Sequence, residues 1–226
     1  MKKIILIVII AFVVGCTEEN PLEPISAPTL PIVAFKGPNT TSTHEEAKNV
    51  KAFVSSFNAF TTSFDAFSLT QPTVSGDTYT WTLTESSLTL RLTATIRSDS
   101  GYTWKLILNG NDGSTTYNNW TAIEGTTDAG MRNAAWNIYE DNTTTKSSDF
   151  LWTITSSGSL VGTLNQYVAG ALSGQTTITD NANFTGEVRV YQSTVQTYRA
   201  IWLSNGSGQY FYYDANGVVT SQGTWQ

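Results

Sequence analysis

Hydrophobic and polar positions follow two different periods, with the change close to residue 72. Between residues 47 and 67 the apolar positions recur every three or four residues, as on one face of an α-helix. Five of them are phenylalanines: Phe53, Phe57, Phe60, Phe64 and Phe67. Burying each ring stabilises a fold by roughly 1.5–3 kcal/mol. This amphipathic helix is therefore expected to pack against a sheet.

The expected start and end of this helix come from local signals. Ser42 and Thr43 are each followed three residues later by a glutamate, which is a capping-box pattern, and Pro72 lies beyond the end. A helix lying on a bilayer surface is the alternative. Its polar side, with Lys48 and Lys51, has fewer cations than that role favours.

After residue 72 the period is two. The segments TYTWTLTE (78–85), LTLRLTATIR (88–97) and YTWKLILN (102–109) alternate apolar residues with polar ones, which is typical of antiparallel sheets with one buried face. Gly, Asn, Asp and Ser separate these segments and supply hairpin turns. We predict one mainly β domain over residues 42–226. It would be an up-and-down antiparallel meander of about 11–12 strands, curled into a closed or half-open barrel, with the helix packed on the sheet.

Two segments in the C-terminal half of the chain resemble each other. AWNIYEDNTTTKSSDFLW (135–152) and QYFYYDANGVVTSQGTW (209–225) share an aromatic pair, an acidic residue, a turn and a final tryptophan. The second is similar to the hairpins of MORN-like repeat proteins. This resemblance covers less than a fifth of the chain and implies antiparallel hairpins, with no activity attached.

The first sixteen residues have the three parts of an export signal. Lys2 and Lys3 are followed by an apolar run over residues 4–14 and by Gly15 and Cys16. The run is too short to span a bilayer comfortably, since spanning takes about 20 residues. The stretch VVGC (13–16) resembles the lipobox of bacterial lipoproteins, although that motif usually has leucine where Val13 stands. The resemblance implies cleavage of a signal peptide over residues 1–15 and a lipid on Cys16, which would anchor the chain to a membrane.

Cys16 is the only cysteine, so the domain is expected to fold without disulfides. An acidic pair, Glu18 and Glu19, follows it and resembles the export tag of surface-exposed lipoproteins. We therefore expect the outer membrane as the location, facing the cell exterior, with the inner-facing leaflet as the alternative. Five of the six prolines lie between residues 21 and 38, which predicts an extended tether over residues 16–41.

Charge and residue types exclude several functions. The formal net charge is −6, and an acidic surface repels phosphate backbones, so nucleic acid is not an expected partner. His44 is the only histidine and lies at the start of the helix, where it is expected to be solvated. The sequence has no His/Cys cluster for a metal and no phosphate-binding loop, and we expect no cofactor.

The carboxylates offer one catalytic hypothesis. Seven aspartates fall in predicted turns: Asp99, Asp112, Asp128, Asp141, Asp149, Asp180 and Asp214. Four glutamates lie at or within predicted strands: Glu85, Glu124, Glu140 and Glu187. Two of these glutamates facing each other would form a glycosidase pair, and solvated strand ends are the alternative interpretation.

Tryptophans recur every 16 residues, at Trp104, Trp120, Trp136 and Trp152. The midpoint of each pair falls in a predicted turn, so at least three of the four are expected on one face of neighbouring strands. We favour a core stripe under the helix, with an aromatic platform for a sugar chain or a lipid as the functional alternative.

The sequence thus favours a non-enzymatic, membrane-tethered envelope protein whose β domain binds or scaffolds. A polysaccharide or a lipid is the expected class of ligand. One alternative is a carrier or sensor of an apolar ligand held between sheet and helix, as in half-barrel lipoprotein carriers. Another is a carbohydrate-active enzyme.

Overall fold

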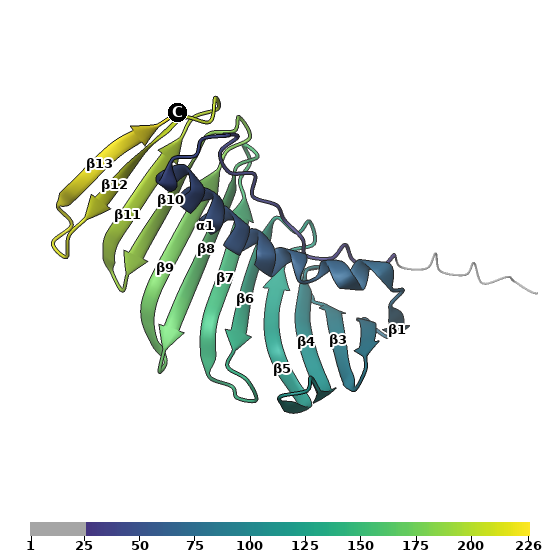
Figure 1. Ribbon diagram of the computed structural model, residues 1–226. Coiled ribbons are helices and arrows are strands. Elements are labelled where there is room, and N and C mark those ends of the chain that lie inside the picture. Colours follow the sequence, from purple (N-terminus) through teal and green to yellow (C-terminus); the bar gives the residue numbers. More distant parts are fainter. Residues whose placement is uncertain (1–25) are drawn as a thin grey trace, which may run out of the picture.

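The computed structural model describes residues 26–226 (Figure 1). The predicted signal peptide, Cys16 and the acidic pair lie outside the described residues. The helical elements are α1 (Glu45–Thr62) and the short 3-10 helix η1 (Asp65–Leu69). The strands are β1 (Thr73–Ser75), β2 (Thr78–Glu85), β3 (Leu88–Ile96), β4 (Tyr102–Asn111), β5 (Thr116–Thr127), β6 (Asn133–Tyr139), β7 (Lys146–Ile154), β8 (Leu160–Val168), β9 (Ala171–Asp180), β10 (Gly186–Gln192), β11 (Val195–Trp202), β12 (Gly208–Tyr213) and β13 (Val219–Trp225).

The thirteen strands form one antiparallel sheet in which each strand pairs with the next along the chain. The predicted up-and-down meander with one N-terminal helix on the sheet is therefore confirmed, with one or two more strands than expected. The sheet is curved but not closed, because β1 and β13 do not pair. Helix α1 lies across one face, as Figure 1 shows. Within residues 26–226 no helix has the length and apolar character needed to cross a bilayer.

Helix α1 begins and ends differently from the prediction. Its N-cap is His44, whose Nδ1 accepts a hydrogen bond of 3.2 Å from the backbone N–H of Glu46, so neither Ser42 nor Thr43 caps it. The α-helix ends at Thr62, and a separate 3-10 turn carries Phe67 into the core. The apolar spacing in the sequence extends through residues 63–69, beyond the end of α1, because a 3-10 turn also brings residues three apart to one side.

The segment before the helix belongs to the folded body. Phe35 is buried, and Asn58 of α1 accepts from the Phe35 N–H and donates to its carbonyl, both at 2.8 Å. The Lys36 N–H donates to the buried carboxylate of Asp180, whose pKa is raised by that burial. The expected tether over residues 16–41 therefore reaches into the domain, whose core begins before residue 42.

Large and small residues alternate across neighbouring strands on the face that carries α1. Gly125 of β5 lies between Trp104 and Trp136 in the ladder, and Gly208 of β12 lies between Trp202 and Trp225. A Cβ on Gly208 would lie 2.0 Å from the indole of Trp225. The indoles of Trp136 and Trp225 thus pack against Gly125 and Gly208, where no side chain opposes them.

A candidate binding surface on the open face of the sheet

Three of the four regularly spaced tryptophans belong to the buried core. Trp104, Trp136 and Trp152 are at most 2 % exposed, and the ring centroids of Trp136 lie 6.4 Å from Trp104 and 5.9 Å from Trp152. In this arrangement they are core residues and offer no exposed ligand platform. Trp120 lies outside this row, stacks on Tyr117 and donates from Nε1 to the Thr143 carbonyl at 2.9 Å.

The hairpin centre and two bulges together explain the departure of Trp120. Asn111 pairs with Thr116, so the hairpin turns between Gly113 and Ser114 and not at Asp112, which moves the expected partner of Trp104 by three residues. The β4–β5 ladder shifts register twice, after Leu106 and after Leu108, and Asn119 has a positive φ of 49°. A bulge adds one residue to one strand and moves every later pair. Gly125, not Trp120, is therefore the partner of Trp104.

The other face of the sheet, here called the open face, carries the side chains that alternate with the core residues. Lys105 follows the core residue Trp104, Asp149 precedes the core residue Phe150, and Arg199 lies between the core residues Tyr198 and Ala200. Successive side chains of a strand point to opposite faces, so all three charged residues lie on the open face. Helices α1 and η1 both pack on the opposite, aromatic face.

Polar side chains form one line across seven strands of the open face. Each is the ladder partner of the next, from β4 to β10. The members of this polar row are Lys105, Glu124, Asn137, Asp149, Asn165, Gln175 and Tyr191. With strands about 4.8 Å apart, the row is about 29 Å long.

Asp149 is the centre of the row and is only 9 % exposed. Its carboxylate accepts from the Tyr167 hydroxyl at 2.6 Å, from Asn165 at 2.7 Å and from Lys146 at 3.1 Å. Asn165 in turn accepts from Gln175 at 2.8 Å. Burial raises the pKa of Asp149, but these three donors outweigh it and leave the pKa below its usual range. The carboxylate is therefore ionised and fixed, and it fixes the amides and the tyrosine beside it.

A second group of interacting side chains lies on β4, β5 and β6, to one side of Asp149. The Tyr139 hydroxyl donates to Glu124 at 2.5 Å, and Lys105 lies 3.8 Å from the same carboxylate. Burial and this hydrogen bond raise the pKa of Tyr139 to about 12. Asn137 is the ladder partner of both Glu124 and Asp149. Within residues 26–226 its side-chain amide makes no hydrogen bond, so it is available to a ligand.

A third group, here called the arginine pair, lies on β10 and β11. The Glu187 carboxylate accepts from Arg189 at 2.9 Å and from Nε of Arg199. Burial raises the pKa of Glu187, but the hydrogen bonds and charges of both guanidinium groups outweigh it, so the pKa is lowered. The Arg199 guanidinium also lies 5.9 Å from the ring centroid of Phe211 on β12.

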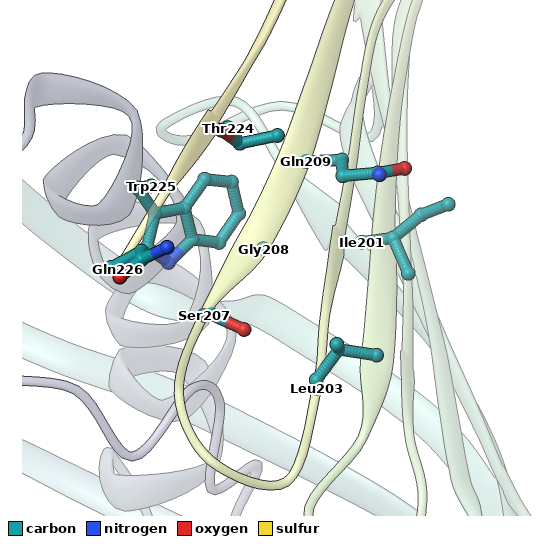
Figure 2. A pocket seen from close by; sticks show the side chains of 8 residues that line it. All are labelled: Ile201, Leu203, Ser207, Gly208, Gln209, Thr224, Trp225 and Gln226. Carbon is teal, nitrogen blue, oxygen red and sulfur yellow. The ribbon is translucent and has the colours of Figure 1, made fainter.

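Two shallow hollows adjoin the arginine pair at the last strands of the sheet. One, of about 360 Å³, is lined by Gln209, Phe211, Gln222, Gly223 and Thr224. The other, of about 310 Å³, shares Gln209 and Thr224 and extends to Ile201 and Leu203. Figure 2 shows the side chains of Ile201, Leu203 and Gln209 on one side of the sheet, with the indole of Trp225 behind Gly208 on the other. Both hollows therefore lie next to the arginine pair, and the second is also lined by the buried indole of Trp225.

The predicted positions of the acidic residues are partly corrected. Asp112, Asp128 and Asp214 do accept backbone N–H groups in turns, whereas Asp149 and Asp180 are buried at strand positions. Propensity placed these two in turns, where aspartate is most favoured, and tertiary partners hold them in the sheet instead.

The hypothesis of a glycosidase pair finds no geometric support. Among its four glutamates, Glu124 and Glu187 lie on the open face, but on β5 and β10. Five strand spacings separate them, roughly 24 Å, and a pair of catalytic carboxyls lies within about 10 Å. Glu85 ends β2 and Glu140 follows β6, both exposed. Within residues 26–226 no three His, Cys, Asp or Glu side chains gather as a metal site.

No protein-family model matches this chain, and a search of curated proteins finds no significant match. The candidate surface therefore rests on the geometry of the open face alone.

Proposed function

We propose that this chain is a membrane-anchored envelope lipoprotein whose β domain binds a polysaccharide on the open face without cleaving it. The anchor is the lipid on Cys16 suggested by the lipobox-like stretch, and the location is the outer membrane, facing the cell exterior. No cofactor or nucleic acid takes part. The single observation that carries the binding role is the polar row across seven neighbouring strands.

The chemistry of the row suits sugar hydroxyls. Fixed carboxylate, amide and tyrosine groups offer both donors and acceptors, and a hydroxyl group needs both. Asp149 is bound by three donors before any ligand arrives, so the surface is ordered in advance and little side-chain entropy is lost on binding. An extended sugar chain also repeats at a length similar to the strand spacing, which allows one contact for each strand.

The two other functions considered for this chain have less support. A carrier of an apolar ligand would need space between α1 and the sheet, but Phe57 and Phe60 fill that position against Phe150, at centroid distances of 5.3 Å and 4.8 Å. A hydrolase would need a carboxylic acid with a raised pKa near a second carboxylate. On the open face, Asp149 and Glu187 instead have lowered pKa values.

The binding role is tested by replacing Asn137, whose side-chain amide makes no hydrogen bond to any residue between 26 and 226. Asn137→Ala removes hydrogen bonds of about 0.5–1.5 kcal/mol each, so affinity for a bound polysaccharide should fall about two- to tenfold. Asn216→Ala, in the exposed turn after β12, is the matched control and should bind like the parent. A panel of immobilised polysaccharides identifies a ligand first. Equal binding by both variants, or no binding to any polymer by the parent, contradicts the proposal.

The anchor is tested separately. Mass spectrometry of the chain isolated from its host should show a lipidated Cys16 at the amino terminus. Cys16→Ala should move the protein from the membrane fraction to the soluble fraction. A chain that begins at Met1, or a Cys16→Ala variant that stays in the membrane, contradicts the anchor and leaves the binding role untouched.

A further inference from the structure

We propose that the polysaccharide is acidic and that the arginine pair, Arg189 and Arg199, binds its carboxylate groups. This inference rests on the proposed binding function and adds the chemical class of the ligand and the place where its charge is recognised. The site lies on β10–β12, beside the two hollows of the open face.

The open face has a charge opposite to that of the whole chain. The formal net charge of the chain is −6. The strands nevertheless place five cations on the open face against three carboxylates, Glu124, Asp149 and Glu187. The five cations are Arg91, Lys105, Lys146, Arg189 and Arg199. An acidic protein with a locally cationic face attracts anionic polymers to that face and repels them elsewhere.

The excess of cations is concentrated where two guanidinium groups share one carboxylate. Glu187 neutralises one of them, so the group keeps a net positive charge. Arg199 uses its Nε for Glu187, and within residues 26–226 its two terminal nitrogens donate to no other group. A guanidinium presents its N–H groups in a fixed fork that matches a carboxylate, so these terminal nitrogens suit an incoming anion.

The surroundings of Arg199 have the other features of a sugar site. Phe211 lies below the guanidinium and also lines the hollow of about 360 Å³. Gln209 and Gln222, at the rim of the same hollow, offer amide donors and acceptors to hydroxyl groups. A sugar ring placed in this hollow would lie next to Arg199, because Arg199 and Phe211 are ladder partners.

An anionic lipid headgroup shares part of this chemistry, but continuity favours the polymer. Tyr191, the last member of the polar row, is the partner of Gln175, and Arg189 lies two residues from it on the same face of β10, so the arginine pair adjoins the end of the row. A single headgroup would use the arginine pair alone. A chain molecule would use the arginine pair and the row together.

The test compares charge variants of the full chain, purified in mild detergent, for binding to polygalacturonate and to uncharged dextran. Arg199→Gln should weaken binding to polygalacturonate about tenfold or more and reduce its dependence on salt. Arg189→Gln should act in the same direction, and it replaces Arg199→Gln if that variant loses its parental melting curve. Lys48→Gln, on α1 at the opposite side of the sheet, is the control and should bind like the parent.

The outcomes separate this inference from the proposed function. If the parent binds dextran as tightly as polygalacturonate, and Arg199→Gln binds both like the parent, the acidic ligand is wrong and the polysaccharide role stands. If vesicles containing phosphatidylglycerol bind and displace polygalacturonate, and Asn137→Ala has no effect, the site is a lipid site and the inference is overturned. If the parent binds no polymer in the panel, the proposed function fails together with this inference.

Discussion

Gly162 is the position where one added methyl group tests the packing of helix, sheet and N-terminal segment together. It lies in β8 between its ladder partners Trp152 and Ile178. A Cβ built there would lie 2.5 Å from Cζ of Phe35 and 2.8 Å from Cε1 of Phe57. Both rings are buried, and they already contact each other at a centroid distance of 5.3 Å.

Gly162→Ala should therefore destabilise the fold by overpacking. Inserting a methyl group into a filled core typically costs about 1–3 kcal/mol. For a domain of this size, each kcal/mol lowers the melting temperature by about 2–4 °C. Gly174→Ala is the matched control in the next strand. There the nearest atom is the flexible Gln166 side-chain oxygen at 3.3 Å, so this variant should melt like the parent or slightly higher.

A double variant locates the strain. Phe35→Leu shortens the side chain whose ring atom is nearest to a new Cβ at position 162. Gly162→Ala should therefore lower the free energy of unfolding less in that background than in the parent. Thermal unfolding followed by circular dichroism measures all four chains. If Gly162→Ala melts like the parent, or costs the same in both backgrounds, Phe35 does not lie over Gly162 and the docking of the N-terminal segment is wrong.

The remaining predictions concern the core and the row. Phe57→Asp places an unpaired charge at a site that is 1 % exposed and should abolish stable folding, whereas Ser56→Asp on the exposed side should not, as circular dichroism will show. Trp152→Ala should cost about 3–5 kcal/mol in urea unfolding, and Trp120→Ala clearly less, because Trp120 is only half-buried. Asp149 has a lowered folded pKa, so its stabilisation is present above about pH 4 and is lost as the pH falls further. Asp149→Asn should flatten the dependence of the free energy of unfolding on pH below about pH 4.

Each of these predictions has an outcome that would contradict it. Parental melting of Phe57→Asp contradicts the helix orientation, and equal costs for the two tryptophan variants contradict the bulged register of β5. An Asp149→Asn variant with the same acid dependence as the parent would show that the three donors do not stabilise the carboxylate.

The architecture could be predicted because it depends on periodicity. Alternation of period two identifies half-buried strands, and the phenylalanine spacing identifies the face of α1. Neither signal depends on the exact position of a turn. The pairing of residues across strands does depend on it. The hairpin centre between Gly113 and Ser114 and the two bulges between β4 and β5 together moved Trp120 out of the core row. A glycine inside a strand marks close approach, so Gly125 was the signal that a neighbouring indole lies over that position.

The polar row could not be predicted for the same physical reason. The sequence shows that Asp149 and Asn165 are polar, but only the observed register makes them partners. The position of Phe35 was likewise open, since an apolar stretch docks wherever the fold leaves a groove, and no local pattern states where that groove is.

Covalent labelling of lysines tests most directly whether the open face is the binding surface. Lys105 and Lys146 lie on the open face with side chains that are 48 % and 37 % exposed, and Lys48 lies on α1 at 58 %. Acetylation of the full chain with and without polygalacturonate, read by mass spectrometry, compares their reactivity within one sample. The account predicts that the polymer protects Lys105 and Lys146 and leaves Lys48 unchanged. Protection of Lys48 with no change at Lys105 and Lys146 would place the ligand on the helix side and contradict it.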